Sequence, residues 1–185
     1  MALLESVKIP LGFPLPTFEL KDFSGKLFCS AALPAERGLL VIFSCNHCPY
    51  AQAVWPRLLR LARYAAGMRV ATVAINPNIH PEYPEDSPAK MEELSHTLEM
   101  SFPYLVDDKQ DVARLFKAQC TPDIYLFNGK KELVYHGRID DNWKDEDAVT
   151  REELKEAMNN MAAGLSVDKK QNPSMGCSIK WCLKA

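Results

Sequence analysis

The chain has 185 residues, of which 47% are hydrophobic, and this length and composition predict a single domain with a substantial core. Its net charge of −2 gives no support for nucleic acid or an anionic membrane as a partner. No apolar run approaches the ~18 residues of a membrane span. Residues 1–17 do not resemble a secretory signal. Six cysteines without such a signal predict a reducing cytoplasmic location.

The first half of the chain combines short strand patterns with one long helix pattern. Residues 14–28 alternate apolar and polar side chains, which predicts a β-hairpin. Residues 39–43 form an unbroken apolar run that is typical of a buried parallel strand. Apolar residues at helical spacing predict a helix over 50–66. Residues 69–75 then predict a second buried strand.

The second half opens with a proline-rich segment, residues 76–87, that predicts an exposed loop. Four further elements precede the last helix: a helix over 87–100, a short strand over 104–106, a short helix over 111–117, and a hairpin of strands 124–127 and 132–135 around Asn128-Gly129. Thr150 and Glu153 have the spacing of a capping box, which predicts a final helix to about residue 163.

Residues 164–185 are polar and irregular, and we expect no further core element there. Ile179 and Trp181 nevertheless stand out in this segment, and burying both could stabilise it by roughly 3 to 5 kcal/mol before the cost of ordering the chain. The sequence therefore predicts a domain over residues 1–163, with residues 164–185 as a tail that docks on it.

The order of elements predicts the fold class. Strands that alternate with helices require a parallel sheet with crossover connections, and the Asn-Gly hairpin adds an antiparallel edge. The predicted class is therefore α/β. Cys45 and Cys48 directly follow the first parallel strand, at its carboxyl end, where such sheets place their chemistry.

The segment Cys45-Asn46-His47-Cys48 is the strongest functional signal in the chain. At a strand-to-helix junction, backbone N–H groups and the helix dipole stabilise a thiolate. We expect Cys45 to be the nucleophile and the more exposed of the pair, and Cys48 to resolve the mixed disulfide. His47 can donate to the thiolate, which would lower its pKa and make the disulfide easier to reduce. The alternative for His47 is an exposed loop histidine without a role.

Zinc binding is the competing interpretation of the same cysteines. A Cys-x-x-Cys pair is half of many zinc sites, and Cys177 and Cys182 offer a second pair for a zinc-stabilised binding module. Structural zinc pairs usually lie in tight turns, so the strand-to-helix setting favours redox chemistry. That chemistry needs no metal or organic cofactor, because the pair itself carries two electrons.

Three segments carry a family resemblance. The active-site segment 43–50 resembles that of the thioredoxin-like superfamily, and Cys120-Thr121-Pro122-Asp123 resembles the loop whose cis-proline faces the cysteines there. Residues 14–20 with Gly25 resemble the hairpin of its peroxiredoxin-like branch, the alkyl hydroperoxide reductase/thiol-specific antioxidant family. The resemblance covers residues 13–163. It implies a thioredoxin-like fold with an N-terminal β-hairpin extension and a C-terminal tail.

The resemblance also implies an activity. The expected protein is an antioxidant thiol-disulfide oxidoreductase that reduces protein disulfides with electrons from a thioredoxin-type donor. The alternative is a thiol peroxidase that reduces hydroperoxides. Peroxiredoxins resemble one another in a P-x-x-x-T-x-x-C pattern. Counted back from Cys48, this chain has Cys45 at the threonine position and Val41 at the proline position, so it departs from that pattern.

Two neighbours of Cys120 complete the expected site. X-Pro bonds adopt the cis form at low cost, and a cis bond before Pro122 would turn the backbone of Thr121 toward the cysteines, ready to pair with an extended substrate strand. Cys120 itself is either a small core residue, as buried cysteines commonly are, or a third redox partner.

Two more residues are candidates for accessory roles. Arg138 could stabilise a thiolate or bind an anionic substrate group, or it could form an exposed ion pair with Asp140 or Asp141. Cys177 could accept the disulfide from the pair and act as a relay, or it could be idle.

Overall fold

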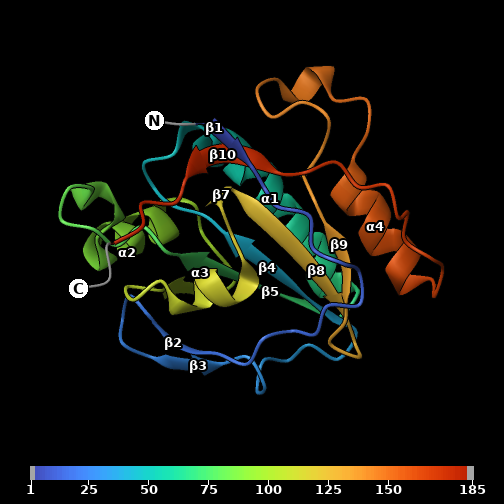
Figure 1. Cartoon of the computed structure of the whole chain (residues 1–185), viewed down its shortest axis with the longest axis horizontal. Coiled ribbons are helices and arrows are strands. Elements are labelled where there is room, and N and C mark those ends of the chain that lie inside the picture. Colours follow the sequence, from blue (N-terminus) through green and yellow to red (C-terminus); the bar gives the residue numbers. More distant parts are fainter. Residues whose placement is uncertain (1–2, 183–185) are drawn as a thin grey trace.

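The computed structural model describes residues 3–182 and is built around a seven-stranded mixed sheet (Figure 1). Its strands are β2 (Glu19–Asp22), β3 (Leu27–Cys29), β4 (Gly38–Phe43), β5 (Val70–Asn76), β6 (Tyr104–Val106), β8 (Asp123–Asn128) and β9 (Leu133–His136). They lie in the order β3-β2-β6-β5-β4-β8-β9. The three strands β4, β5 and β6 run parallel, and the outer pairs are antiparallel. The predicted parallel core with an antiparallel hairpin edge is confirmed.

Helices cover both faces of this sheet. They are α1 (Pro49–Gly67), α2 (Pro88–Thr97), α3 (Asp111–Phe116) and α4 (Glu153–Ala162), with short 3₁₀ turns η1 (Pro84–Asp86) and η2 (Glu146–Ala148). Side chains of α1, α2 and α4 pack in one core cluster with Leu40 and Ile42 of β4. Side chains of α3 pack on the opposite face with Val41 and Phe43. Figure 1 shows α3 and α1 on these two sides of the sheet.

The sequence of the central strand β4 is continuously apolar because both faces of the strand are buried. All six of its residues are buried, because alternate side chains enter the two core clusters. The strand ends at Phe43, and α1 begins at Pro49, so the residues between them are held at the carboxyl edge of the sheet. The first parallel strand and the first helix are thus confirmed where the sequence predicted them.

A second, three-stranded sheet lies over this edge, with β10 (Met175–Ser178) between β1 (Leu3–Glu5) and β7 (Cys120–Thr121). The expectation that residues 164–185 add no further element is therefore wrong for β10. The segment Met-Gly-Cys-Ser has no strand periodicity of its own, and its pairing partners are distant in the sequence. Beyond β10, Ile179 is 3% exposed in the core and Trp181 packs beside it. Residues 183–185 lie outside the described part of the chain.

Two local expectations are also wrong. Thr150 does not cap α4, which begins at Glu153; its hydroxyl donates to the carboxylate of Asp141 instead. The proline-rich loop after β5 is not uniformly exposed, because Asp86 within it is fully buried. Both errors have one physical cause, since distant polar partners hold these residues.

The close pairing of β10 with β7 depends on Gly176. A Cβ atom added there would lie 1.9 Å from the carbonyl oxygen of Thr121. We therefore expect Gly176→Ala to lower the free energy of unfolding by about 1–3 kcal/mol, the usual cost of overpacking. Denaturant unfolding measures this change. Gly67→Ala is the matched control, since its Cβ would meet nothing within 4 Å. Equal unfolding midpoints for Gly176→Ala and wild type would contradict the expectation.

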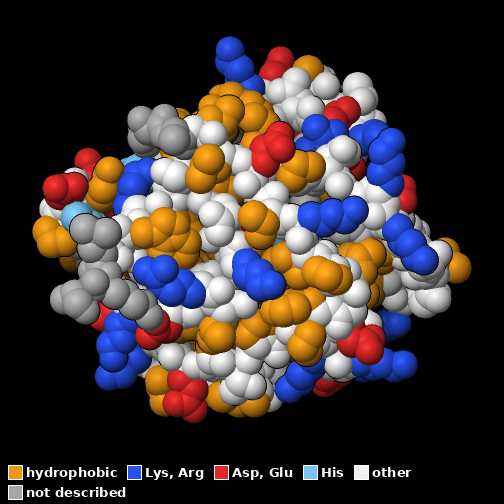
Figure 2. All heavy atoms as spheres, viewed as in Figure 1, with side chains coloured by type: hydrophobic (Ala, Val, Ile, Leu, Met, Phe, Trp, Pro, Cys, Tyr) orange, Lys and Arg blue, Asp and Glu red, His pale blue; other side chains and the backbone are white. Residues whose placement is uncertain are grey.

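The described surface gives two further observations. No helix within residues 3–182 is long and apolar enough to span a membrane. On the face in Figure 2, acidic and hydrophobic side chains are interspersed among the lysines and arginines.

Candidate active site

Cys45 and Cys48 lie at the junction of β4 and α1, as the sequence predicted, and both side chains are fully buried. Cys48 occupies the N-cap position of α1, and Pro49 is the first residue of the helix. Ala51 and Cys177 pack against the pair. The expectation that Cys45 is the more exposed of the two is therefore wrong, because both residues are 0% exposed.

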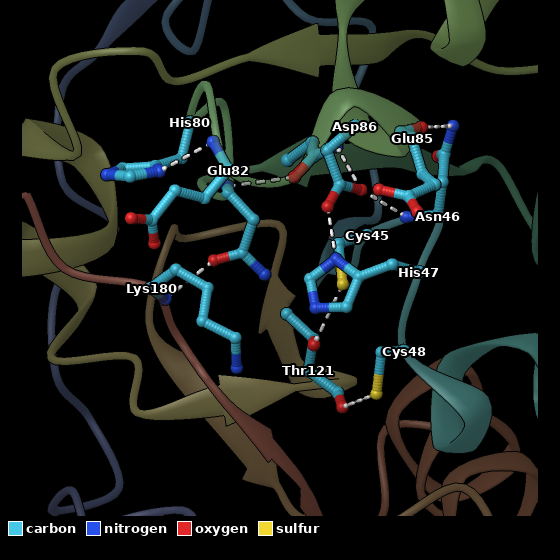
Figure 3. A network of polar contacts seen from close by, with 12 residues as sticks. Cys45, Asn46, His47, Cys48, His80, Glu82, Glu85, Asp86, Thr121 and Lys180 are labelled. Atoms are coloured by element: carbon cyan, nitrogen blue, oxygen red, sulfur yellow. Dashed lines mark hydrogen bonds and ion pairs between the residues drawn. The ribbon is translucent and has the colours of Figure 1, made fainter. Parts of the chain in front are cut away.

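The loop before β8 faces the two cysteines. The Thr121–Pro122 peptide bond is cis, as expected. Thr121 contacts both members of the pair: its Oγ1 lies 3.2 Å from Cys45 Sγ, and its carbonyl oxygen lies 2.9 Å from Cys48 Sγ (Figure 3). The backbone of Thr121 is thus turned toward the cysteines, as the sequence predicted.

Cys48 is the thiol that ionises more easily. A hydrogen bond from the Cys45 thiol stabilises the Cys48 thiolate, and the backbone N–H of Ala51 and the Cys177 thiol donate to it as well. Together these hydrogen bonds outweigh the effect of burial and lower the pKa of Cys48 to about 4. One contact opposes this shift. The protonated Cys48 thiol donates to the Thr121 carbonyl oxygen, which favours the neutral form. The donors, which include the backbone N–H of Cys177, outweigh this one acceptor, so the net shift of the Cys48 pKa is downward.

Cys45 behaves in the opposite way. Burial raises the pKa of Cys45 well above its ordinary value, and its hydrogen bond to Cys48 and the negative charge of Asp86 raise it further. The pair therefore loses its first proton readily, from Cys48, and retains the second on Cys45. The sequence predicted the thiolate on Cys45. The hydrogen bonds received by Cys48, together with the burial of Cys45 and the charge of Asp86, favour the thiolate on Cys48 instead.

Asp86 is a site residue that sequence reasoning missed. Its Oδ1 accepts hydrogen bonds from the backbone N–H of Asn46 (2.6 Å) and the side-chain amide of Asn76 (3.2 Å). Its Oδ2 bonds Nδ1 of His47. A usable signal existed, since the loop that holds Asp86 follows β5, and the carboxyl ends of neighbouring parallel strands meet at one edge of a sheet.

His47 is part of a buried polar arrangement rather than an exposed loop residue. Its side chain is 9% exposed and stacks on the ring of Tyr83, with ring centroids 4.7 Å apart. Because Asp86 accepts at Nδ1, the neutral imidazole carries its proton there and leaves Nε2 as an acceptor. Nε2 is buried and has no hydrogen-bond partner among the described residues. The alternative of an exposed histidine is wrong.

The predicted four-cysteine zinc set does not assemble in residues 3–182. Cys45, Cys48 and Cys177 share one cluster, but Cys182 lies elsewhere, where its backbone N–H donates to Gln110. The one described group whose donor atoms are close enough for a metal ion is Cys45, His47 and Asp86, with these atoms within 4.8 Å of one another.

Cys120 and Arg138 are the two remaining candidates, and each is held by other interactions. Cys120 is fully buried in β7, and burial raises its pKa far above the ordinary value. Arg138 forms a two-pronged ion pair with Glu153, at 2.6 and 3.0 Å. The alternative of an ion pair between Arg138 and Asp140 or Asp141 is wrong, because the carboxylate of Asp140 bonds Arg57 and that of Asp141 bonds Thr150.

The charge of Asp86 leads to a prediction about Cys45. Because the Asp86 carboxylate raises the pKa of Cys45, we expect Asp86→Asn to lower that pKa, by on the order of one pH unit. A titration that follows the Cys45 Cβ resonance by NMR measures the shift. Asp108→Asn, at an exposed position, is the control and should leave Cys45 unchanged. An unchanged or higher Cys45 pKa in Asp86→Asn would contradict the assignment.

A Cys-x-x-Cys pair at a strand-to-helix junction, with a cis-proline loop opposite, is typical of thioredoxin-like thiol oxidoreductases. The model of the AhpC/TSA family matches residues 11–136. The chain belongs to this family and is an oxidoreductase with a thioredoxin-like fold. No curated protein matches it.

Solved structures agree with this fold. An uncharacterised conserved protein from Geobacillus kaustophilus is 37% identical, with a TM-score of 0.94 over 100% of this chain and 99% of that one. A peroxidoxin from Mycobacterium tuberculosis is 15% identical, with a TM-score of 0.63 over 84% and 98%. A secreted disulfide oxidoreductase from the same organism is 16% identical, with a TM-score of 0.58 over 80% and 96%. At this level of identity, the two structures from Mycobacterium tuberculosis show only that the fold is similar.

Proposed function

We propose that the protein is a thiol-disulfide oxidoreductase in which Cys45 and Cys48 cycle between dithiol and disulfide. One observation carries the proposal: Cys45 and Cys48 are buried in one cluster, and Thr121 contacts both of their sulfur atoms, at 3.2 Å and 2.9 Å. The pKa of Cys48 is lowered there, which favours its thiolate. Contact between a thiolate and a second thiol is what disulfide formation requires. The pair releases two electrons when the S–S bond forms, so the reaction needs no metal or organic cofactor.

In this proposal each residue near the pair has a role. Cys48 attacks as the thiolate, and Cys45 then closes the disulfide and loses its proton. His47 accepts that proton at Nε2, since Asp86 holds the proton of the ring on Nδ1. One ring nitrogen of His47 lies within 4.8 Å of Cys45 Sγ, so the imidazole is next to the thiol that loses the proton. Thr121 holds both sulfur atoms in place.

The proposed partners follow from the chemistry of the pair. The dithiol reduces a protein disulfide, and a thioredoxin-type dithiol then regenerates it by exchange. We place the reaction in the cytoplasm, where such donors keep thiols reduced. An antioxidant role in redox homeostasis would follow from that reaction.

Hydroperoxide reduction is the second candidate, and burial of the pair favours it. Both sulfur atoms are fully covered, and a small oxidant reaches them with less displacement of the chain than a polypeptide does. The Cys48 thiolate would attack the O–O bond, giving a sulfenic acid and an alcohol or water. Cys45 would then displace water from that sulfenic acid to form the disulfide.

Insulin reduction and hydrogen peroxide consumption, measured side by side on wild type and Cys45→Ser, test the proposal. Insulin reduction that depends on Cys45 supports dithiol exchange as the activity. Peroxide consumption without insulin reduction would assign the second candidate instead. Stoichiometric zinc in the purified protein, with neither activity, would contradict both candidate functions.

A further inference from the structure

The strand β10 occupies the backbone edge beside the active-site cysteines. It pairs antiparallel with β7, and Cys177 lies opposite Thr121 in the register. An extended substrate strand would use this same edge, because β-strand addition pairs backbone groups along an exposed strand. The chain therefore supplies its own strand where a substrate strand would pair, and that strand carries a cysteine at the position facing the active site.

The side chain of Cys177 contacts the active-site pair. Its thiol hydrogen-bonds Cys48, and Cys177 is 2% exposed in a cluster with Cys45, Cys48 and Ala51. Gly176 permits this approach, since a Cβ there would collide with the Thr121 carbonyl oxygen. Cys48 thus has two thiol neighbours, Cys45 and Cys177, and Cys120 bonds instead to the carbonyl of Pro122 (3.6 Å).

We propose that Cys177 is a third redox residue, which exchanges with the Cys45–Cys48 disulfide to form a Cys48–Cys177 disulfide. This inference rests on the proposed dithiol/disulfide cycle and extends it from the buried pair to β10.

The exchange step is balanced without an external reactant. The Cys177 thiolate attacks Sγ of Cys48, the Cys48–Cys177 bond forms, and the Cys45–Cys48 bond breaks. Cys45 leaves as a thiolate and takes up the proton that Cys177 lost. No electrons are gained or lost, because one disulfide replaces another.

The charge on Cys48 determines when this step occurs. Burial, the hydrogen bond to Cys48 and the charge of Cys48 raise the pKa of Cys177 to about 12, while Lys180 lowers it. When Cys48 enters a disulfide, its negative charge disappears and the influence of Lys180 remains. Cys177 is therefore held as a thiol while the pair is reduced, and it becomes easier to ionise once the pair is oxidised.

Cys45→Ser isolates the proposed contact, because it leaves Cys48 with Cys177 as its remaining thiol neighbour. The variant is oxidised mildly with hydrogen peroxide, remaining thiols are alkylated, and linked peptides are mapped by mass spectrometry after non-reducing digestion. We expect the Cys48–Cys177 linkage as the main product. Adding Cys177→Ser should abolish it, and adding Cys182→Ser, the matched control, should leave it unchanged.

Circular dichroism confirms that each variant is folded, and Cys177→Ala replaces Cys177→Ser if the latter is not. A folded Cys45→Ser protein without the Cys48–Cys177 linkage would overturn the inference, as would equal linkage of Cys48 to Cys120. Wild type, treated in parallel, shows whether a negative result defeats only the role of Cys177 or the proposed function as well. A Cys45–Cys48 disulfide there, with no Cys48–Cys177 linkage in Cys45→Ser, defeats the inference alone. Absence of any disulfide at Cys48 in wild type defeats the proposed function as well.

Discussion

Cys48→Ser should abolish thiol-dependent turnover, with a loss in kcat of roughly 10³-fold or more, as expected when the attacking group is removed. The reason is that Cys48 is the cysteine whose pKa is lowered and the one in contact with both neighbouring thiols. Serine keeps the size of the side chain but does not ionise at neutral pH. Steady-state assays with insulin and with hydrogen peroxide, each supplied with a dithiol donor, measure the loss.

Cys29→Ser is the matched control for that loss. Cys29 lies on β3 and is half-buried, at the edge strand of the large sheet and away from the pair. We expect its activity to equal that of wild type. A Cys48→Ser protein that kept more than about a tenth of wild-type turnover would show that another group attacks the substrate.

The second large effect is on the pH dependence of the reduced protein. Because the pKa of Cys48 is lowered from 9.0 to about 4, its thiolate absorbance in the ultraviolet should persist from neutral pH down to about pH 5 and disappear near pH 4. An ordinary cysteine would lose this absorbance near pH 9. The Cys48→Ser protein serves as the blank. A transition above pH 8 in the difference between wild type and Cys48→Ser would contradict the stabilised thiolate.

The same shift determines how stability depends on pH. The folded-state pKa of Cys48 lies below its unfolded value of 9.0, so the thiolate's contribution to stability is fully present above pH 9. That contribution falls as the pH drops toward about 4, where the folded state also takes up the proton. Between these limits, denaturant unfolding of the reduced protein should show the free energy of unfolding decreasing as the pH is lowered. Cys48→Ser should remove this part of the decrease.

Local sequence patterns predicted the frame of the active site correctly. The apolar run that forms β4 and the helical spacing that forms α1 are properties of neighbouring residues, so they place Cys45 and Cys48 at the sheet edge without further knowledge. The cis bond before Pro122 followed from the family resemblance of a short motif. These features depend on little beyond the segment that contains them.

Contacts between distant segments account for what the sequence did not predict. Asp86 reaches His47 from the loop after β5, and Cys177 reaches Cys48 through the pairing of β10 with β7. The assignment of the thiolate failed for a related reason. The motif alone shows two cysteines, whereas burial, Asp86 and Cys177 together decide which of them ionises.

The most direct test of the central claim, that Cys45 and Cys48 are the redox pair, is an equilibrium redox titration of wild type with disulfides mapped at each potential. We expect one two-electron transition in which Cys48 becomes linked to Cys45, or to Cys177 after exchange. Its midpoint should lie above thioredoxin's ~ −270 mV, since a stabilised thiolate favours the reduced form. The opposite result is a protein in which both cysteines remain thiols across the whole titration, and it would contradict the claim.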